Sequence, residues 1–73
     1  MQFVIPNTTE DKINNAIQAI RDAGGTVIGN RFSVKGVEGA YFMHGSNLVI
    51  DITDKPFLAS WKMIEIKIKE FFG

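Results

Sequence analysis

A chain of 73 residues that contains no cysteine has few ways to become stable. Disulfides are excluded, and so are metal sites and catalytic centres that depend on a thiolate. One small apolar core supplies only about 3 to 5 kcal/mol, and contact with another subunit is the remaining support. We therefore expect a single domain over residues 1–73, in which each helix and strand gives one apolar face to a shared core.

Composition and charge argue against several classes of partner. The chain is 45% hydrophobic and 22% charged, which is typical of a globular domain rather than a disordered one. Eight basic residues balance eight acidic ones, so no net charge attracts nucleic acid or an anionic membrane. The start MQFVIP lacks the features of a signal peptide, and no segment approaches membrane-spanning length. We expect a cytoplasmic protein.

The first third of the chain predicts a strand followed by an amphipathic helix. Gln2 to Ile5 is a short β-rich run. Asn7 or Thr8 suits the helix cap, with an acidic residue three positions later, and Gly24-Gly25 suits the helix end. The apolar residues at helical spacing are Ile13, Ala16, Ile17, Ile20 and Ala23.

The middle of the chain predicts strands separated by turns. Gly29-Asn30 and Lys35-Gly36 are equally good breaks, so the register of the first part stays open. Val37 to Met43 is the next strand, and His44 to Asn47 is a turn cluster. Leu48 to Thr53 then alternates apolar and polar residues, as a half-buried strand does.

Residues 57–73 predict a second helix, although the run from Ile64 to Lys69 alternates like a strand. Asp54 and Pro56 suit the first turn of a helix. At about 100° per residue, the large apolar side chains fall on one stripe, whereas a strand explains only the three isoleucines. This predicted core stripe contains Phe57, Trp61, Ile64, Ile68, Phe71 and Phe72.

These elements together predict an α+β fold. Two helices with one apolar stripe each and an antiparallel sheet with one apolar face are satisfied by a two-layer sandwich. We expect the order β-α-β-β-β-α, with both helices on the same face of the sheet. The other face is expected to carry Val49, Asp51 and Thr53, together with Tyr41 and Met43.

A second apolar line on the last helix is the leading candidate for a site. Ala59, Met63 and Ile66 recur at i, i+4 and i+7, opposite the core stripe. Single apolar residues on a surface are normal, but a second line on the most hydrophobic helix of a small domain favours contact with another subunit, protein or hydrophobic surface. We expect a non-enzymatic, bacterial-type interaction module, a homo-oligomer or the binder of a protein partner, without cofactor or metal.

A small hydrolase is the first alternative. His44, the only histidine, lies near Ser46, and a base beside a serine nucleophile would use Asp51 or Asp54 as its third member. A solvated hairpin turn explains the same residues with fewer requirements. Metal binding is not expected, because no second histidine and no cysteine exist. Phosphate loops are not expected either, because the glycines do not lead into a helix start.

An RNA-binding domain is the second alternative. The order of helix, strands and helix invites comparison with double-stranded RNA-binding domains, and Phe32, Tyr41 and Phe42 could stack on bases. Lys62 and Lys69 share one edge of the last helix, but acidic residues lie beside them. Without a basic stripe, no nucleic-acid partner is expected.

Four features of the second half of the chain occur together. They are the glycine-punctuated strand Val37-Glu38-Gly39, the alternating strand Leu48 to Ile52, the break Pro56-Phe57-Leu58 and the helical pair Ile64-Glu65. In this combination, the run VEGAYFMHGSNLVIDITDKPFLASWKMIEIKIKEFF is similar to the small polyhydroxyalkanoic acid system, or granule-associated, protein family. The first half differs, because the family carries a basic, histidine-containing segment where this chain has IPNTTEDKINNAI. The resemblance implies a non-enzymatic protein associated with storage-polymer granules or their regulation, and it brings no catalytic residues.

Overall fold

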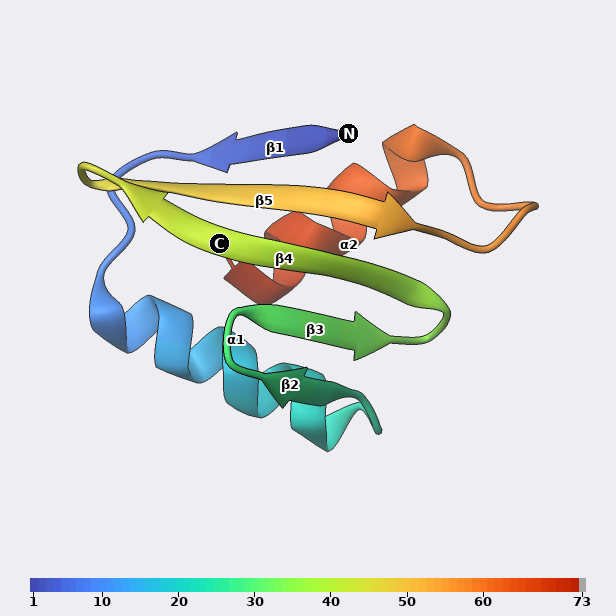
Figure 1. Cartoon of the computed structure of the whole chain (residues 1–73), viewed down its shortest axis with the longest axis horizontal. Coiled ribbons are helices and arrows are strands. Elements are labelled where there is room, and N and C mark those ends of the chain that lie inside the picture. The colour runs from blue at the N-terminus through green and yellow to red at the C-terminus, as the bar shows by residue number, and fades with distance from the viewer. Residues whose placement is uncertain (73) are drawn as a thin grey trace.

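The computed structural model describes residues 1–72 as one sheet and two helices. The elements are β1 (Gln2–Ile5), α1 (Glu10–Asp22), β2 (Thr26–Ile28), β3 (Arg31–Val34), β4 (Val37–His44), β5 (Asn47–Asp54) and α2 (Trp61–Phe72). All neighbouring strands pair antiparallel, in the order β1-β5-β4-β3-β2 (Figure 1). The predicted α+β class with an antiparallel sheet is confirmed.

The segment whose register stayed open in the sequence uses both of its candidate turns. Gly29-Asn30 joins β2 to β3, and Lys35-Gly36 joins β3 to β4. Lys35 and Gly36 have φ angles of 51° and 82°, the left-handed backbone that a two-residue hairpin turn of this kind requires. The sheet therefore has one short strand more than the predicted order contains.

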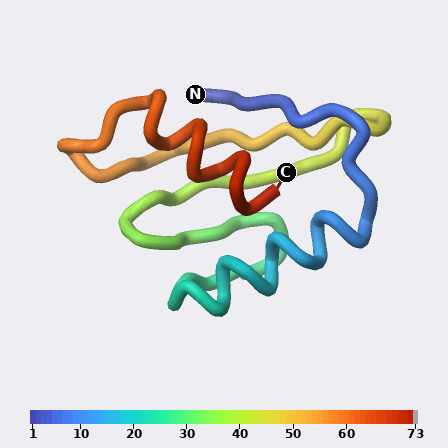
Figure 2. The backbone as a smooth tube through the Cα atoms, turned by 180° about the vertical axis from the view of Figure 1, so that it is seen from behind, coloured from blue at the N-terminus to red at the C-terminus, as the bar shows by residue number. Residues whose placement is uncertain are grey.

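The core lies between the sheet and the helices. Both helices lie behind the sheet in Figure 1 and in front of it in Figure 2, which shows the opposite side. Alternate residues of β5 are buried, as the sequence predicts. A single cluster of buried side chains joins the layers: Phe3, Ala16, Ile20, Phe32, Val34, Val37, Leu48, Ile50, Ile52, Ile64, Ile68 and Phe72.

Tyr41 and Met43 do not lie on the open face of the sheet, where the sequence placed them. Tyr41 pairs with the buried Ile50 in β5, and directly opposite residues share a face. The Tyr41 ring lies 6.2 Å from the ring of Phe72, and its hydroxyl donates a hydrogen bond to the Gly29 carbonyl at 3.2 Å. The helix side of β4 therefore carries Tyr41, and Met43 shares its parity.

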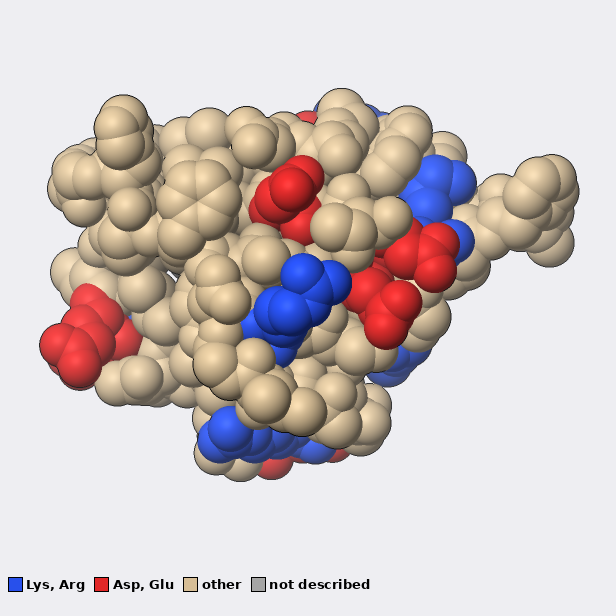
Figure 3. Space-filling model, viewed as in Figure 1, with Lys and Arg blue, Asp and Glu red and all other residues tan. Residues whose placement is uncertain are grey.

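The open face carries Phe42 instead. Phe42 stands opposite Val49, and Val49 also stands opposite Val4 of β1. Val49, Asp51 and Thr53 alternate with the buried residues of β5, so they lie on this face as predicted. Figure 3 shows the same face with Asp, Glu, Lys and Arg side chains scattered among uncharged ones.

Helix α1 begins one or two residues later than the predicted caps. Thr9 is the N-cap, and its hydroxyl accepts a hydrogen bond from the backbone N–H of Lys12 at 3.3 Å. Thr8 is buried, where its hydroxyl donates to the Ile5 carbonyl at 3.0 Å. Its N–H donates to the Ser46 carbonyl at 2.9 Å, so Thr8 ties the chain to the β4–β5 turn rather than capping the helix.

Replacing the Thr9 cap tests this assignment. Thr9→Ala is expected to lower the free energy of unfolding by about 1 kcal/mol, because one N–H at the helix start loses its acceptor. Urea denaturation followed by circular dichroism measures the loss. Thr9→Ser keeps the hydroxyl and should remain close to the wild type, and an equal loss in both variants would contradict the cap.

Helix α2 also begins later than predicted, and this removes Phe57 from the core stripe. The helix starts at Trp61, where the Ser60 hydroxyl accepts from the N–H of Met63 at 3.2 Å. The helical count of 100° per residue applies only from this point, because Pro56 and Ala59 form a separate turn. Phe57 is consequently 94% exposed, and Trp61, the first residue of the helix, is 39% exposed. The rest of the predicted stripe is buried or partly buried against the core: Ile64, Ile68, Phe71 and Phe72.

Candidate functional site

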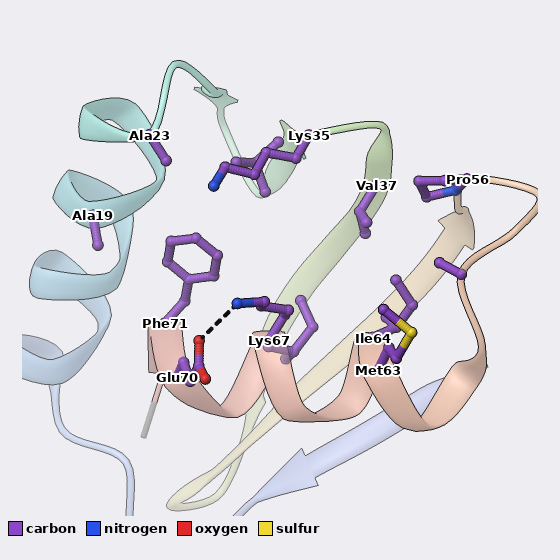
Figure 4. A pocket seen from close by; sticks show the side chains of 13 residues that line it. Ala19, Ala23, Lys35, Val37, Pro56, Met63, Ile64, Lys67, Glu70 and Phe71 are labelled. Carbon is purple, nitrogen blue, oxygen red and sulfur yellow. Dashed lines mark hydrogen bonds and ion pairs between the residues drawn. The ribbon is translucent and has the colours of Figure 1, made fainter.

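A groove of about 490 Å³ lies between the two helices, with the turn from β3 to β4 along one side (Figure 4). Helix α1 contributes only the short side chains of Ala19 and Ala23, which end at Cβ and leave the space open. In Figure 2 the helices are closest near the end of α2 and separate toward its start. The remaining apolar lining includes Val34, Val37, Met63 and Phe71.

The rim of the groove carries three charged side chains. Lys35 extends across the opening toward Phe71 in Figure 4, and the Lys67 ammonium lies 3.4 Å from the Glu70 carboxylate. The Lys67 and Glu70 side chains are 68% and 61% exposed, and an exposed ion pair of this kind contributes little to stability. These flexible side chains therefore leave the apolar lining accessible.

The predicted line of Ala59, Met63 and Ile66 is divided between two places. Ala59 precedes the helix and is half-buried, and it lines the groove together with the exposed Met63. Ile66 is 48% exposed but does not line the groove. The structure thus brings Ala59 and Met63 together and leaves Ile66 on the outward side of α2.

The loop between β5 and α2 is the feature that the sequence analysis missed. Phe57 and Leu58 are 94% and 91% exposed, the highest values among the large hydrophobic residues that the structure describes as exposed. The loop projects beyond the sheet in Figure 1, and the same projection in Figure 3 carries no charge at its end. Ser60, a cap residue three positions before Met63, was the available signal that the helix begins after Phe57 and Leu58.

Known proteins give no family for this chain. No protein-family model matches it. The curated proteins and the solved structures likewise contain no match. The candidate contact surfaces are the groove, the projecting loop and the other exposed side chains.

His44 and Ser46 lie in a hairpin turn, as one interpretation of the sequence predicts. Both residues are exposed, and Gly45 between them has a φ angle of 65°. His44 pairs with Asn47, whereas Asp51 lies four residues further along β5, a rise of roughly 14 Å. The structure therefore does not bring Asp51 to His44, and neither His44 nor Ser46 lines the groove.

The three aromatic residues of the RNA-binding alternative do not share a surface. Phe32 is 3% exposed in the core, and Tyr41 packs against Phe72 on the helix side of the sheet. Only Phe42 lies on the open face. Lys62 and Lys69 each lie 3.8 Å from the Glu65 carboxylate, which offsets part of their charge at the edge of α2.

Residues 1–72 contain neither a cluster of metal ligands nor a membrane-spanning helix. Within residues 1–72, no three His, Cys, Asp or Glu side chains are grouped so that they could hold a metal ion. Across the same residues, neither helix has the length and apolar character needed to cross a membrane.

Proposed function

We propose that this chain is a small non-enzymatic interaction module that self-associates through the apolar surface around α2. The observation that carries the proposal is where the exposed hydrophobic side chains gather. Five of the ten exposed large hydrophobic residues in the described part of the chain fall within ten consecutive positions: Phe57, Leu58, Trp61, Met63 and Ile66.

The energy of such a contact is large relative to the stability of a domain this small. Full burial of one large apolar side chain contributes roughly 1.5 to 3 kcal/mol. A standard interface takes about 800 Å² from each partner, roughly a sixth of the 4646 Å² that this chain exposes. Burial of the surface around α2 would thus add to the stability that one small core supplies, which is only about 3 to 5 kcal/mol.

Lysine substitutions on α2 test the proposal. Met63→Lys with Ile66→Lys places two charges in the proposed contact, and we expect the dimer dissociation constant to rise at least about tenfold, since 1.4 kcal/mol corresponds to that factor. Sedimentation velocity over a range of concentrations measures the constant. Asn14→Lys adds charge to an exposed position of α1 and serves as the matched control. A wild type that stays monomeric, with variants that sediment identically, would refute the proposal.

Association with a storage-polymer granule is a second proposal, supported by the family resemblance and by Ile66. This side chain lies outside the groove and is 48% exposed, so it is available to a flat hydrophobic surface. Cosedimentation with polyhydroxyalkanoate granules is expected to capture the wild type and to lose Ile66→Lys. Equal recovery of both proteins, or of neither, would count against this role.

A further inference from the structure

The projecting loop and the groove are complementary features of the same chain. We propose that the loop tip, Phe57 and Leu58, docks into the groove between α1 and α2 of a second copy. This docking mode rests on the self-association proposed above and specifies the surfaces that meet.

The tip does not fill the groove of its own chain. The N–H of Ala59 donates to the Pro56 carbonyl at 3.0 Å, which closes a turn around Phe57 and Leu58. The Lys55 ammonium donates to the Ala59 carbonyl at 2.6 Å and lies 5.4 Å from the centre of the Trp61 ring. These contacts fix the base of the loop, and neither tip residue belongs to the groove lining.

The groove has the size and lining that the tip requires. An apolar cavity of about 150 Å³ already holds benzene, so a groove of about 490 Å³ has room for the Phe57 ring and the Leu58 side chain. Phe71 offers an aromatic partner to the incoming ring, and the flexible Met63 side chain can adapt to its shape. Filling the groove would remove from water both its lining and the two most exposed hydrophobic side chains.

The position of the loop permits a closed dimer. Pro56 and Ala59 flank the tip and also line the groove, so the two features are neighbours on the surface. A two-fold axis beside this loop would place each tip in the groove of the other copy, with the same contacts made twice. Self-association through these surfaces therefore ends at two copies instead of continuing as a chain.

Charge favours a second copy over a lipid surface. Loop tips that enter membranes rely on basic residues to meet anionic headgroups. Here the chain has no net charge, and the one lysine of the loop is turned back to the Ala59 carbonyl. Asp54, three residues before Phe57, is exposed. An acidic residue beside the tip is complementary to Lys35 at the rim of the groove, where Lys67 is already paired with Glu70.

Disulfide trapping tests the docking directly, because the chain has no cysteine of its own. Leu58→Cys and Ala19→Cys are prepared as two separate proteins, mixed and oxidised gently. We expect a covalent heterodimer in the mixture, because a disulfide requires the two Cα atoms within about 7 Å. Asn14→Cys, exposed elsewhere on α1, replaces Ala19→Cys in the control mixture, which should give little product.

The outcomes separate this inference from the function on which it rests. A wild type that remains monomeric in sedimentation overturns both. A dimeric wild type whose Leu58→Cys and Ala19→Cys mixture links no better than the control overturns the docking mode alone. Phe57→Ser with Leu58→Ser should stay folded and weaken the dimer by at least about a hundredfold, because four apolar side chains, two from each copy, lose their burial. Binding of the tip to phosphatidylglycerol vesicles without cross-linking would assign it to lipid instead.

Discussion

Phe72→Ala is expected to lower the free energy of unfolding by about 3 to 5 kcal/mol, which is as much as one small core supplies. Phe72 is 1% exposed, and its ring centre lies 6.2 Å from those of Phe32 and Tyr41. Truncation leaves a cavity where the end of α2 meets β3 and β4. The variant should therefore be largely unfolded without denaturant, as circular dichroism and urea titration would show.

Phe57→Ala is the matched control, because the substitution is the same and the sequence pattern placed both residues on one stripe. Phe57 is 94% exposed, so its removal should leave the stability of the monomer unchanged. The comparison is made at low concentration, where association contributes nothing. A large loss in Phe57→Ala would contradict the start of α2 at Trp61, and a tolerated Phe72→Ala would contradict the burial of Phe72 in the core.

Gly39→Ala is expected to destabilise the sheet by about 1 to 3 kcal/mol, the usual range for overpacking. A Cβ at this position would lie 2.5 Å from the Asp51 carbonyl oxygen and 3.1 Å from the Phe32 ring. The first contact is with the backbone of β5, the neighbouring strand, which cannot move without disturbing its pairing. Thermal unfolding should report a loss of about 4 to 8 °C for each kcal/mol in a domain of this size.

Gly45→Asn provides the contrast for Gly39→Ala. Gly45 lies in the β4–β5 turn, and a Cβ there would have no atom within 4 Å. Its φ angle of 65° is one that asparagine tolerates better than other residues. A small change in melting temperature is expected, and a loss as large as that of Gly39→Ala would show that packing is not the cause.

The sequence correctly predicted the buried face of those elements whose apolar residues follow a single spacing. In β5 every second residue from Leu48 to Ile52 is apolar and its neighbours are mostly polar, so the face was determined without the structure. Ile64 and Ile68 were placed correctly in the core for the same reason, since helical spacing holds throughout α2.

Other features depend on information that a local pattern lacks. Both faces of β4 carry large apolar residues, so only the pairing of Tyr41 with Ile50 shows which face meets the helices. Phe57 fits the stripe of α2 only if the helix already begins at Pro56. The Ser60 cap makes the helix begin later, at Trp61. The groove requires Ala19 and Ala23 to face α2 across a gap, which follows from the packing of distant segments.

The central claim is that the surface around α2 joins two copies of this chain. Sedimentation equilibrium of the unmodified protein, from low micromolar to submillimolar concentration, tests it most directly. The predicted result is an average mass that rises reversibly from 8.1 kDa toward twice that value. A mass that remains 8.1 kDa at every concentration would contradict it.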